Sequence, residues 1–190
     1  SCAYASHGDT KHVLLFPEDP HECFTMTAQA FDLAERLQTP VFLMTDLDIG
    51  MNERLSAPFE WDDKRRYDRG KVLSADDLDA GKAYGRYEDV DGDGVPWRTI
   101  PGTHPDKGAY FTRGTTRDEY ARYSETGPDY LKNVKRLLAK LATAATLVPQ
   151  PVAKPAKRKT RYGVIYFGST SPSMDEALDV LGASGVHVDA

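Results

Sequence analysis

Two short runs of apolar residues lie near the start of the chain and are separated by a longer segment with a helical period. The runs cover residues 12–16 (HVLLF) and 41–45 (VFLMT), and continuous apolar runs of this length are typical of strands buried on both faces. A strand, a helix and a strand joined by short connections predict a βαβ unit. Its two strands are expected to be parallel and its crossover right-handed.

The segment between the two runs carries the signals of a helix that extends to about residue 38. Asp19 suits the N-cap, Pro20 suits the first helical position, and Glu22 has the spacing of a capping box. Thr39-Pro40 then ends the helix. The expected apolar stripe consists of Met26, Ala30, Leu33, Ala34 and Leu37, widened by Phe24 and Phe31.

The rest of the chain changes character twice. Residues 61–125 are polar, lack a sustained apolar period and predict an irregular segment with short strands. A helix is expected at about 128–147, with an apolar face formed by Leu131, Val134, Leu138, Leu141 and Ala145. Residues 148–159 contain prolines and four cations and predict an extended, solvated linker, although its basic run is also suited to an acidic partner.

The C-terminal part resembles the beginning of a second βαβ unit. Residues 162–167 predict a strand, and a helix is expected from about Pro172 or Met174, with capping-box spacing at Ser173 and Glu176. Residues 1–6 have the character of the last turn of a helix, and residues 185–190 that of an interrupted strand. We therefore expect an internal fragment of a longer protein.

Composition restricts the function classes. The 190 residues include 24 Lys and Arg against 29 Asp and Glu, a net charge of −5, which argues against a nucleic-acid groove. No apolar run approaches the roughly 18 residues of a membrane span, and no signal-peptide pattern is present, so we expect a cytoplasmic protein without a membrane partner. Cys2 and Cys23 form no C-x-x-C pair, which excludes a Cys zinc site or an iron–sulfur cluster held by this chain alone.

Several polar clusters are candidates for chemistry. Asp46 and Asp48 follow the second expected strand, and on an extended backbone both carboxylates would point toward the same crevice and face a metal, a positively charged ring or a partner Arg. Alternatively, Asp46 caps a turn and Asp48 pairs with a nearby Arg. The polar loop at 6–12 has donors suited to a carboxylate or phosphate. Residues 168–171 (GSTS) can cradle an anion or simply cap a helix.

One further motif has the spacing of a calcium loop. Asp89, Asp91 and Asp93 match D-x-D-x-D-G with Gly94, the pattern in which alternating oxygens wrap a hard cation. The twelfth position is Ile100, where a bidentate Glu is expected. An Asp/Gly turn is therefore the favoured interpretation, and a metal site at these three residues is the alternative.

Read together and in order, several stretches resemble the alpha subunit of thiamine-diphosphate-dependent 2-oxoacid:ferredoxin oxidoreductases, most closely the 2-oxoglutarate type. These stretches cover essentially the whole chain, which makes the resemblance more specific than any single motif. They are residues 5–12 (ASHGDTKH), 30–42, 45–52 (TDLDIGMN), 68–73 (DRGKVL), 89–94, 98–103 (RTIPGT), 118–120 (DEY) and 162–181.

The resemblance implies an α/β fold in three parts. Residues 1–60 would be the C-terminal part of a pyrimidine-type thiamine-diphosphate-binding domain with a parallel sheet. Residues 61–160 would connect it, through the helix at about 128–147 and the Pro/Lys linker, to the start of a transketolase-C-like domain at 161–190. The implied reaction is oxidative decarboxylation of a 2-oxoacid to acyl-CoA and CO₂, with electrons passed to ferredoxin.

The resemblance also implies partners and site residues. Thiamine diphosphate and Mg²⁺ would be shared with a beta subunit, which would hold the 4Fe–4S cluster, and coenzyme A would be the co-substrate. The loops bearing His7, Asp9 and Asp118 would bind substrate, and Asp46 and Asp48 would shape the site or a subunit contact. Many relatives have Gly/Ser-His where this chain has Thr116-Arg117. The chain alone is expected to be inactive. Another transketolase-like thiamine enzyme, or a non-catalytic assembly or calcium-binding segment, remains an alternative.

Overall fold

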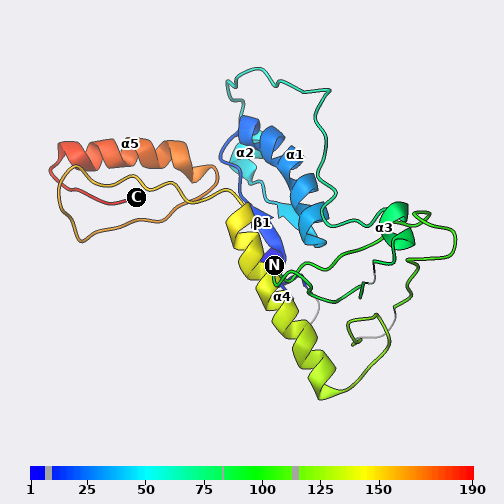
Figure 1. Ribbon diagram of the computed structural model, residues 1–190. Helices are drawn as coiled ribbons and strands as arrows, with labels where there is room; N and C mark the ends of the chain where they lie inside the picture. The colour runs from blue at the N-terminus through cyan, green and yellow to red at the C-terminus, as the bar shows by residue number, and fades with distance from the viewer. Residues whose placement is uncertain (7–9, 83, 113–115) are drawn as a thin grey trace. The chain divides into compact units, whose positions relative to one another are not determined.

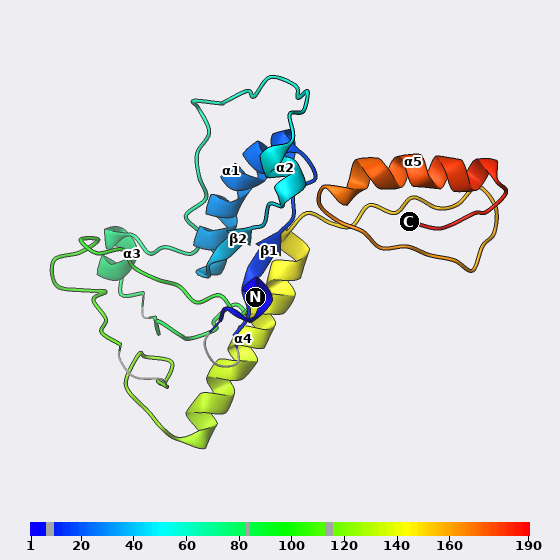
Figure 2. The same cartoon turned by 180° about the vertical axis from the view of Figure 1, so that it is seen from behind.

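The predicted βαβ unit is present in the computed structural model, which describes residues 1–6, 10–82, 84–112 and 116–190 (Figure 1). Strand β1 covers Val13–Leu15, helix α1 covers Pro20–Leu37, and strand β2 covers Val41–Leu43. The two strands form one parallel sheet and lie side by side (Figure 2). The Leu15 carbonyl accepts a hydrogen bond of 2.8 Å from the Met44 amide, immediately after β2.

The chain divides into two compact units that interleave along the sequence. The first unit consists of residues 1–13, 31–40 and 66–148. The second consists of residues 14–30, 41–65 and 149–190. Helix α1 belongs to both units, with residues 20–30 in the second unit and residues 31–37 in the first.

Helix α1 begins where its capping residues predict. The Glu22 amide donates to Asp19 Oδ1 at 2.7 Å, and the Glu22 carboxylate accepts from the Glu18 amide, one residue before the cap. Leu33 and Leu37 of the expected stripe are buried, and Leu37 is fully excluded from solvent. Phe31 is 61% exposed, so the expectation that it widens the buried stripe is wrong.

Helix α4 covers Gly127–Leu147 in the first unit and confirms the predicted helix. Its buried face differs from the expected one, because Leu131 and Leu138 are 52% and 57% exposed within this chain. Side chains on the adjacent face of the helix contact the rest of the unit instead. Thr143 Oγ1 donates to the Asp93 carbonyl at 2.8 Å, and Ala144 is buried.

The polar segment at residues 61–125 is irregular, as predicted. In place of the expected short strands, its described residues contain isolated bridges at Val72–Arg98 and Arg117–Tyr123. It also contains a short helix that the sequence pattern did not indicate, α3 at Ala75–Asp79, which is held by a reciprocal capping box between Ser74 and Asp77. At the N-terminus, a 3₁₀ turn covers Cys2–Tyr4 and agrees with the expected helical turn.

The C-terminal part of the second unit forms helix α5 at Thr170–Ala183. This helix begins earlier than expected, so Ser173 lies inside it and the predicted capping box is wrong. The predicted strand at 162–167 is reduced to one parallel bridge, between Gly163 and Asp189. The linker is exposed at its basic run, 157–159, where the chain bends at residues 157 and 158. Before this run, Lys154 exchanges backbone hydrogen bonds with Ala190, so the expectation of a fully solvated, extended linker is wrong at this residue.

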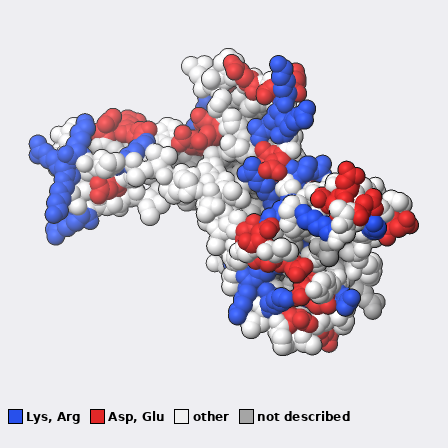
Figure 3. Space-filling view, in the orientation of Figure 1, with Lys and Arg blue, Asp and Glu red and all other residues white. Residues whose placement is uncertain are grey.

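The surface carries charges of both signs. On the face shown in Figure 3, acidic and basic side chains are interspersed, and Lys and Arg gather at the far left, where Figure 1 shows the loop of the linker. None of the helices within the described residues combines the length and the apolar character needed to cross a bilayer.

Candidate functional site

A cavity of about 470 Å³ lies within the first unit. It is enclosed by helix α4 and by five other segments of the unit, at residues 10, 38, 86–87, 96 and 116–117. The lining residues are Thr10, Gln38, Arg86, Tyr87, Pro96, Thr116, Arg117, Tyr130, Asn133, Val134, Arg136, Leu137 and Lys140. Among these residues, which belong to the described part of the chain, four are cationic and none is acidic. The polar loop at 6–12 and the loop before Asp118 thus contribute to one cavity, through Thr10 and Thr116-Arg117.

Close packing of two turns places Tyr87 beside Arg117. The Tyr87 amide donates to the Glu119 carbonyl at 2.9 Å, and a Cβ added to Gly85 would lie 2.6 Å from that carbonyl oxygen. Only glycine therefore permits this approach at position 85. As a result, Arg117 Nη1 donates to Tyr87 Oη at 3.3 Å.

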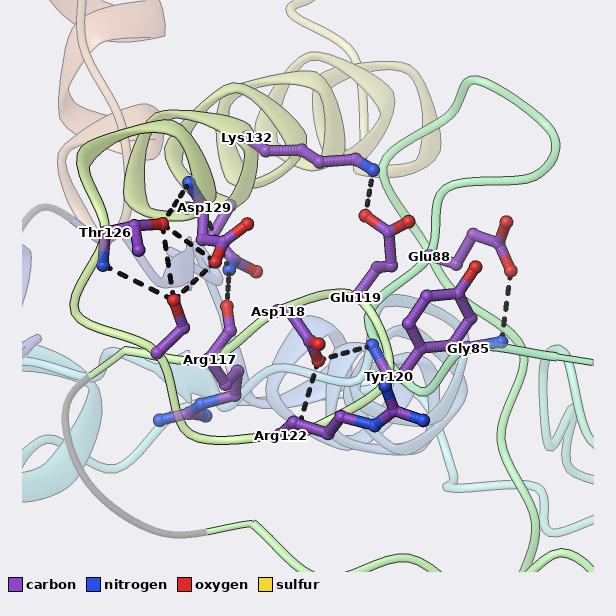
Figure 4. A network of polar contacts seen from close by, with 12 residues as sticks. Gly85, Glu88, Arg117, Asp118, Glu119, Tyr120, Arg122, Thr126, Asp129 and Lys132 are labelled. Atoms are coloured by element: carbon purple, nitrogen blue, oxygen red, sulfur yellow. Dashed lines mark hydrogen bonds and ion pairs between the residues drawn. The ribbon is translucent and has the colours of Figure 1, made fainter.

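Asp118 stabilises the turn that follows it (Figure 4). Its Oδ1 accepts hydrogen bonds of 2.9 Å from the amides of Tyr120 and Arg122. This pairing supports Ala121, which has a positive φ of 69°. Asp118 is not among the cavity-lining residues, whereas its neighbour Arg117 is. The geometry thus gives Asp118 a structural role, and its expected substrate role stays a prediction.

Hydrogen bonds at the first turn and along the middle of helix α4 hold it against the cavity. Thr126 caps the helix by accepting from the Asp129 amide, and Asn133 Nδ2 donates to the Arg117 carbonyl. One to two turns further on, Arg136 Nη1 donates to the Gly94 carbonyl at 3.1 Å. Lys140 Nζ donates to the Gln38 carbonyl at 3.4 Å. These contacts hold both cations against the cavity.

Positive charge is concentrated around one aromatic ring. The guanidinium carbons of Arg86, Arg117 and Arg136 lie 5.2, 5.1 and 5.6 Å from the centroid of the Tyr87 ring, which is cation–π distance. Burial, followed by the charges of Arg136 and Arg86, lowers the pKa of Lys140 to about 8. Burial and the charge of Arg86 also lower the pKa of Arg136. Such an arrangement can hold an anion.

The loop with calcium-like spacing supports the cavity wall. Lys71 Nζ lies 2.6 Å from Asp91 and 2.8 Å from Asp93, so one ammonium group forms ion pairs with two of the three carboxylates. Burial alone would lower the pKa of Lys71, but hydrogen bonds from its ammonium to these carboxylates raise it. No group of three His, Cys, Asp or Glu within the described residues can hold a metal. The structure thus favours the turn interpretation over a cation at Asp89, Asp91 and Asp93.

In the second unit, Asp46 has an extended backbone, with φ −121° and ψ 177°, but Asp48 lies inside helix α2, so the expectation that both residues share one extended stretch is wrong. Asp46 caps helix α2, Leu47–Met51, by accepting from the Ile49 amide at 3.0 Å. Asp48 forms an ion pair with Arg54, as the alternative interpretation held. Asp46 also accepts a hydrogen bond of 2.5 Å from Ser169 Oγ. The carboxyl end of β2 therefore contacts the turn at 168–171, where Ser169 is the N-cap of α5.

Two of the predicted site residues, His7 and Asp9, lie outside the described residues. Arg86, Tyr87, Arg136 and Lys140 were not identified from the sequence. The spacing of Arg136 and Lys140 on one helix face is the single signal that was available for them. Nothing local distinguishes Arg86 and Tyr87, because their place in the cavity depends on long-range packing.

Comparison with known proteins identifies the family and the fold. The family model for pyruvate flavodoxin/ferredoxin oxidoreductase, thiamine diphosphate-binding, matches residues 2–140, a range that includes every cavity-lining residue. The chain is 36% identical over 64 residues to the 2-oxoglutarate synthase subunit KorA of Methanothermobacter marburgensis, covering 33% of this chain and 17% of that protein. It is 26% identical over 149 residues to 2-oxoacid:ferredoxin oxidoreductase 1, subunit alpha, of Sulfurisphaera tokodaii, covering 77% and 22%.

A solved structure has the same fold. It is a 2-oxoglutarate:ferredoxin oxidoreductase from Magnetococcus marinus with 2-oxoglutarate, coenzyme A and succinyl-CoA bound, with a TM-score of 0.82 and 22% identity over all of this chain and 32% of that chain. The present chain spans about a fifth of the length of the curated relatives above. From the family match over most of its residues, we conclude that the chain belongs to the pyruvate flavodoxin/ferredoxin oxidoreductase thiamine diphosphate-binding family.

Proposed function

We propose that this chain is part of the alpha subunit of a 2-oxoacid:ferredoxin oxidoreductase that acts on 2-oxoglutarate in the cytoplasm. The family match over residues 2–140 carries this proposal, and the names of the relatives support it. The reaction would convert a 2-oxoacid and coenzyme A to acyl-CoA and CO₂, with two electrons passed to ferredoxin. Thiamine diphosphate, when bound, supplies the nucleophilic carbon of this chemistry.

The proposed role of this chain is to position the 2-oxoacid. Asp9 directly precedes Thr10 and Asp118 directly follows Arg117, while His7 lies three residues before Thr10, so the expected substrate residues are next to or near residues that line one cavity in the sequence. Donors and cations beside this cavity suit a substrate carboxylate. We propose that Asp46 and Asp48, which fix the turn formed by α2, contribute to a subunit contact or shape the site of the assembled enzyme.

We base the proposed cofactors and partners on the family match and not on metal-binding residues in this chain. The described residues contain no metal-binding group, and Cys2 and Cys23 are single cysteines without a described cluster around them. We therefore assign no Mg²⁺ or cluster ligand here, and we propose that a beta subunit supplies the 4Fe–4S cluster and the diphosphate–Mg²⁺ contacts. Ferredoxin would then accept electrons from the assembled complex.

A dye-reduction assay tests the proposal. The full-length protein that contains this chain, mixed with its beta partner, is expected to reduce a viologen only when 2-oxoglutarate, coenzyme A and thiamine diphosphate are all present. Omission of each component in turn provides the controls, and pyruvate in place of 2-oxoglutarate tests the substrate type. Viologen reduction that does not require a 2-oxoacid would contradict the proposal.

A further inference from the structure

Four cationic side chains lie close together in the sequence, on the linker of the second unit. We call this segment the basic loop, and its cations are Lys157, Arg158, Lys159 and Arg161. All four residues are exposed, and Figure 3 shows Lys and Arg gathered where Figure 1 shows the loop of the linker. The cavity of the first unit includes none of them. The basic loop is thus a concentration of positive charge to which the proposed reaction gives no role.

The acidic residues of the same part of the chain do not pair with the basic loop. Residues 149–190 contain four carboxylate side chains, those of Asp175, Glu176, Asp179 and Asp189. Asp175 forms an ion pair of 2.5 Å with Lys154, which precedes the loop. Asp189 accepts a hydrogen bond of 2.8 Å from the Ala156 amide. Within the described part of the chain, no cation of the basic loop forms an ion pair.

Hydrogen bonds hold the basic loop at both ends. Before the loop, the backbone amide and carbonyl of Lys154 pair with those of Ala190, at 2.6 and 3.0 Å. Near its end, Thr160 Oγ1 donates to the His187 carbonyl at 2.6 Å. A surface that is fixed before binding loses less conformational entropy when a partner binds. These contacts therefore favour the basic loop as a binding surface over a freely moving linker.

An open groove runs beside the basic loop. Its volume is about 500 Å³, and it lies between residues 159–162 and residues 185–187. Lys159 and Arg161 line it, together with Tyr162, which is 59% exposed. Arg and Tyr are among the residues enriched at protein–protein interfaces. The groove thus adds a shaped surface with an aromatic residue to the charges of the loop.

The arrangement of the cations favours an acidic polypeptide as the partner. Residues 157–161 span at most about 14 Å, which is too long for one small anion to contact every cation of the loop. Single contacts to exposed cations are weak and screened by salt. A nucleic-acid duplex or an anionic bilayer presents a wide negative surface, which the acidic residues of helix α5 would repel. These residues are Asp175, Glu176 and Asp179.

We propose that the basic loop and its groove are a docking surface for a protein partner that has an acidic segment, with several Asp or Glu side chains along an extended stretch. Arg158 and Arg161 are suited to bidentate pairs with carboxylates, and the two lysines add further donors. Complementary charge of this kind speeds association and makes it sensitive to salt. The proposal does not depend on the thiamine reaction, so the two can fail separately.

Fluorescence anisotropy on the full-length protein tests the surface. The probe is a labelled peptide of alternating Glu and Ser, about ten residues long so that it spans the loop. The control peptide has Gln in place of Glu. The Glu peptide is expected to bind at least about tenfold more tightly than the Gln peptide at low salt, and its Kd to rise at least about fivefold between about 50 and about 200 mM salt. Inorganic phosphate, a DNA duplex and phosphatidylserine vesicles serve as competitors.

Charge-matched variants assign the binding to the basic loop. Lys159→Gln combined with Arg161→Gln is expected to weaken binding of the Glu peptide at least about fivefold. Lys64→Gln combined with Arg66→Gln removes the same two charges, at the same spacing, from another exposed segment and should change binding less than about twofold. Since all four side chains are exposed, both variants should keep the circular dichroism spectrum of the parent protein.

Four outcomes would overturn the proposal. The first is no binding of the Glu peptide, and the second is an equal loss of binding in the two double variants. The third is displacement of the Glu peptide by inorganic phosphate at a concentration equal to that of the peptide. The fourth is tighter binding of the DNA duplex or of the vesicles than of the Glu peptide, lost in the variant of the basic loop, which would assign the surface to a nucleic acid or a membrane.

Discussion

Replacing Gly94 with Ala tests whether the close approach of the 89–94 loop to helix α4 stabilises the wall of the cavity. Gly94 has a φ of 76°, in the left-handed region that favours glycine. A Cβ added there would lie 2.1 Å from the Lys140 amide nitrogen and 2.4 Å from the Arg136 carbonyl oxygen. Gly92 provides a matched control, because it has a φ of 77° and nothing lies within 4 Å of an added Cβ.

The two substitutions share the backbone cost but differ in the steric cost. An L-residue in the left-handed region costs roughly 1–2 kcal/mol, which a stiffer unfolded chain offsets by about 0.4–1 kcal/mol, so Gly92→Ala should lower the free energy of unfolding by about 1 kcal/mol. In Gly94→Ala, a contact of 2.1 Å must lengthen to at least 3.4 Å, which displaces α4. Overpacking of this kind costs about 1–3 kcal/mol, and each lost hydrogen bond to Asp93 or Gly94 costs about 1 kcal/mol more.

Urea denaturation, followed by the circular dichroism signal of the helices, measures the difference in the free energy of unfolding between the two variants. We expect Gly94→Ala to lose at least about 2 kcal/mol more than Gly92→Ala, which corresponds to a further decrease of roughly 1 M in the urea midpoint. Equal losses in the two variants would refute the argument, since they would show that the close approach of α4 adds nothing beyond the backbone conformation.

Three further predictions concern other parts of the chain. Ser74→Ala removes the N-cap of α3 and should lower the free energy of unfolding by about 1 kcal/mol in chemical denaturation; no change would show that α3 needs no cap. Burial opposes ionisation of Glu35, but hydrogen bonds from Arg98 and Arg69 hold its pKa below the ordinary value of 4.5, so its stabilising contribution should be complete above pH 4.5 and be lost as the pH falls through the lower folded-state pKa. In thermal melts between about pH 3 and pH 6, Glu35→Gln should make the melting temperature depend less on pH. An unchanged pH dependence would count against this role of Glu35. Asp118→Ala should raise KM for the 2-oxoacid in the assembled enzyme several-fold, because the turn that places Arg117 loosens, and an unchanged KM would remove Asp118 from the site.

Helices with strong local signals could be predicted from the sequence. Helices α1 and α4 each have a capping residue, a proline in the first turn and a helical apolar period, all of which act within a few residues. The five-residue helices α2 and α3 are too short to show a period, and their single signals were the caps Asp46 and Ser74. Only the turn alternative for Asp46 and Asp48 anticipated α2.

The features that sequence reasoning missed depend on distant contacts. The predicted strand at 162–167 has the right residues, but strand formation needs a partner, and the structure supplies one bridge to Asp189. An apolar face of α4 was predicted, yet Leu131 and Leu138 of that face are exposed, and the cavity is lined by Val134 of the same face together with Arg136 and Lys140. Periodicity shows that a helix has two faces, whereas which face is covered is decided by elements far away in the sequence.

The stoichiometry of the reaction tests the central claim most directly. The full-length protein assembled with its beta partner is supplied with 2-oxoglutarate, coenzyme A and thiamine diphosphate, and both succinyl-CoA and reduced one-electron viologen are quantified. The account predicts two molecules of viologen reduced for each succinyl-CoA formed, because oxidative decarboxylation releases one electron pair per acyl group. Succinyl-CoA formation without viologen reduction, or viologen reduction without succinyl-CoA, would contradict it.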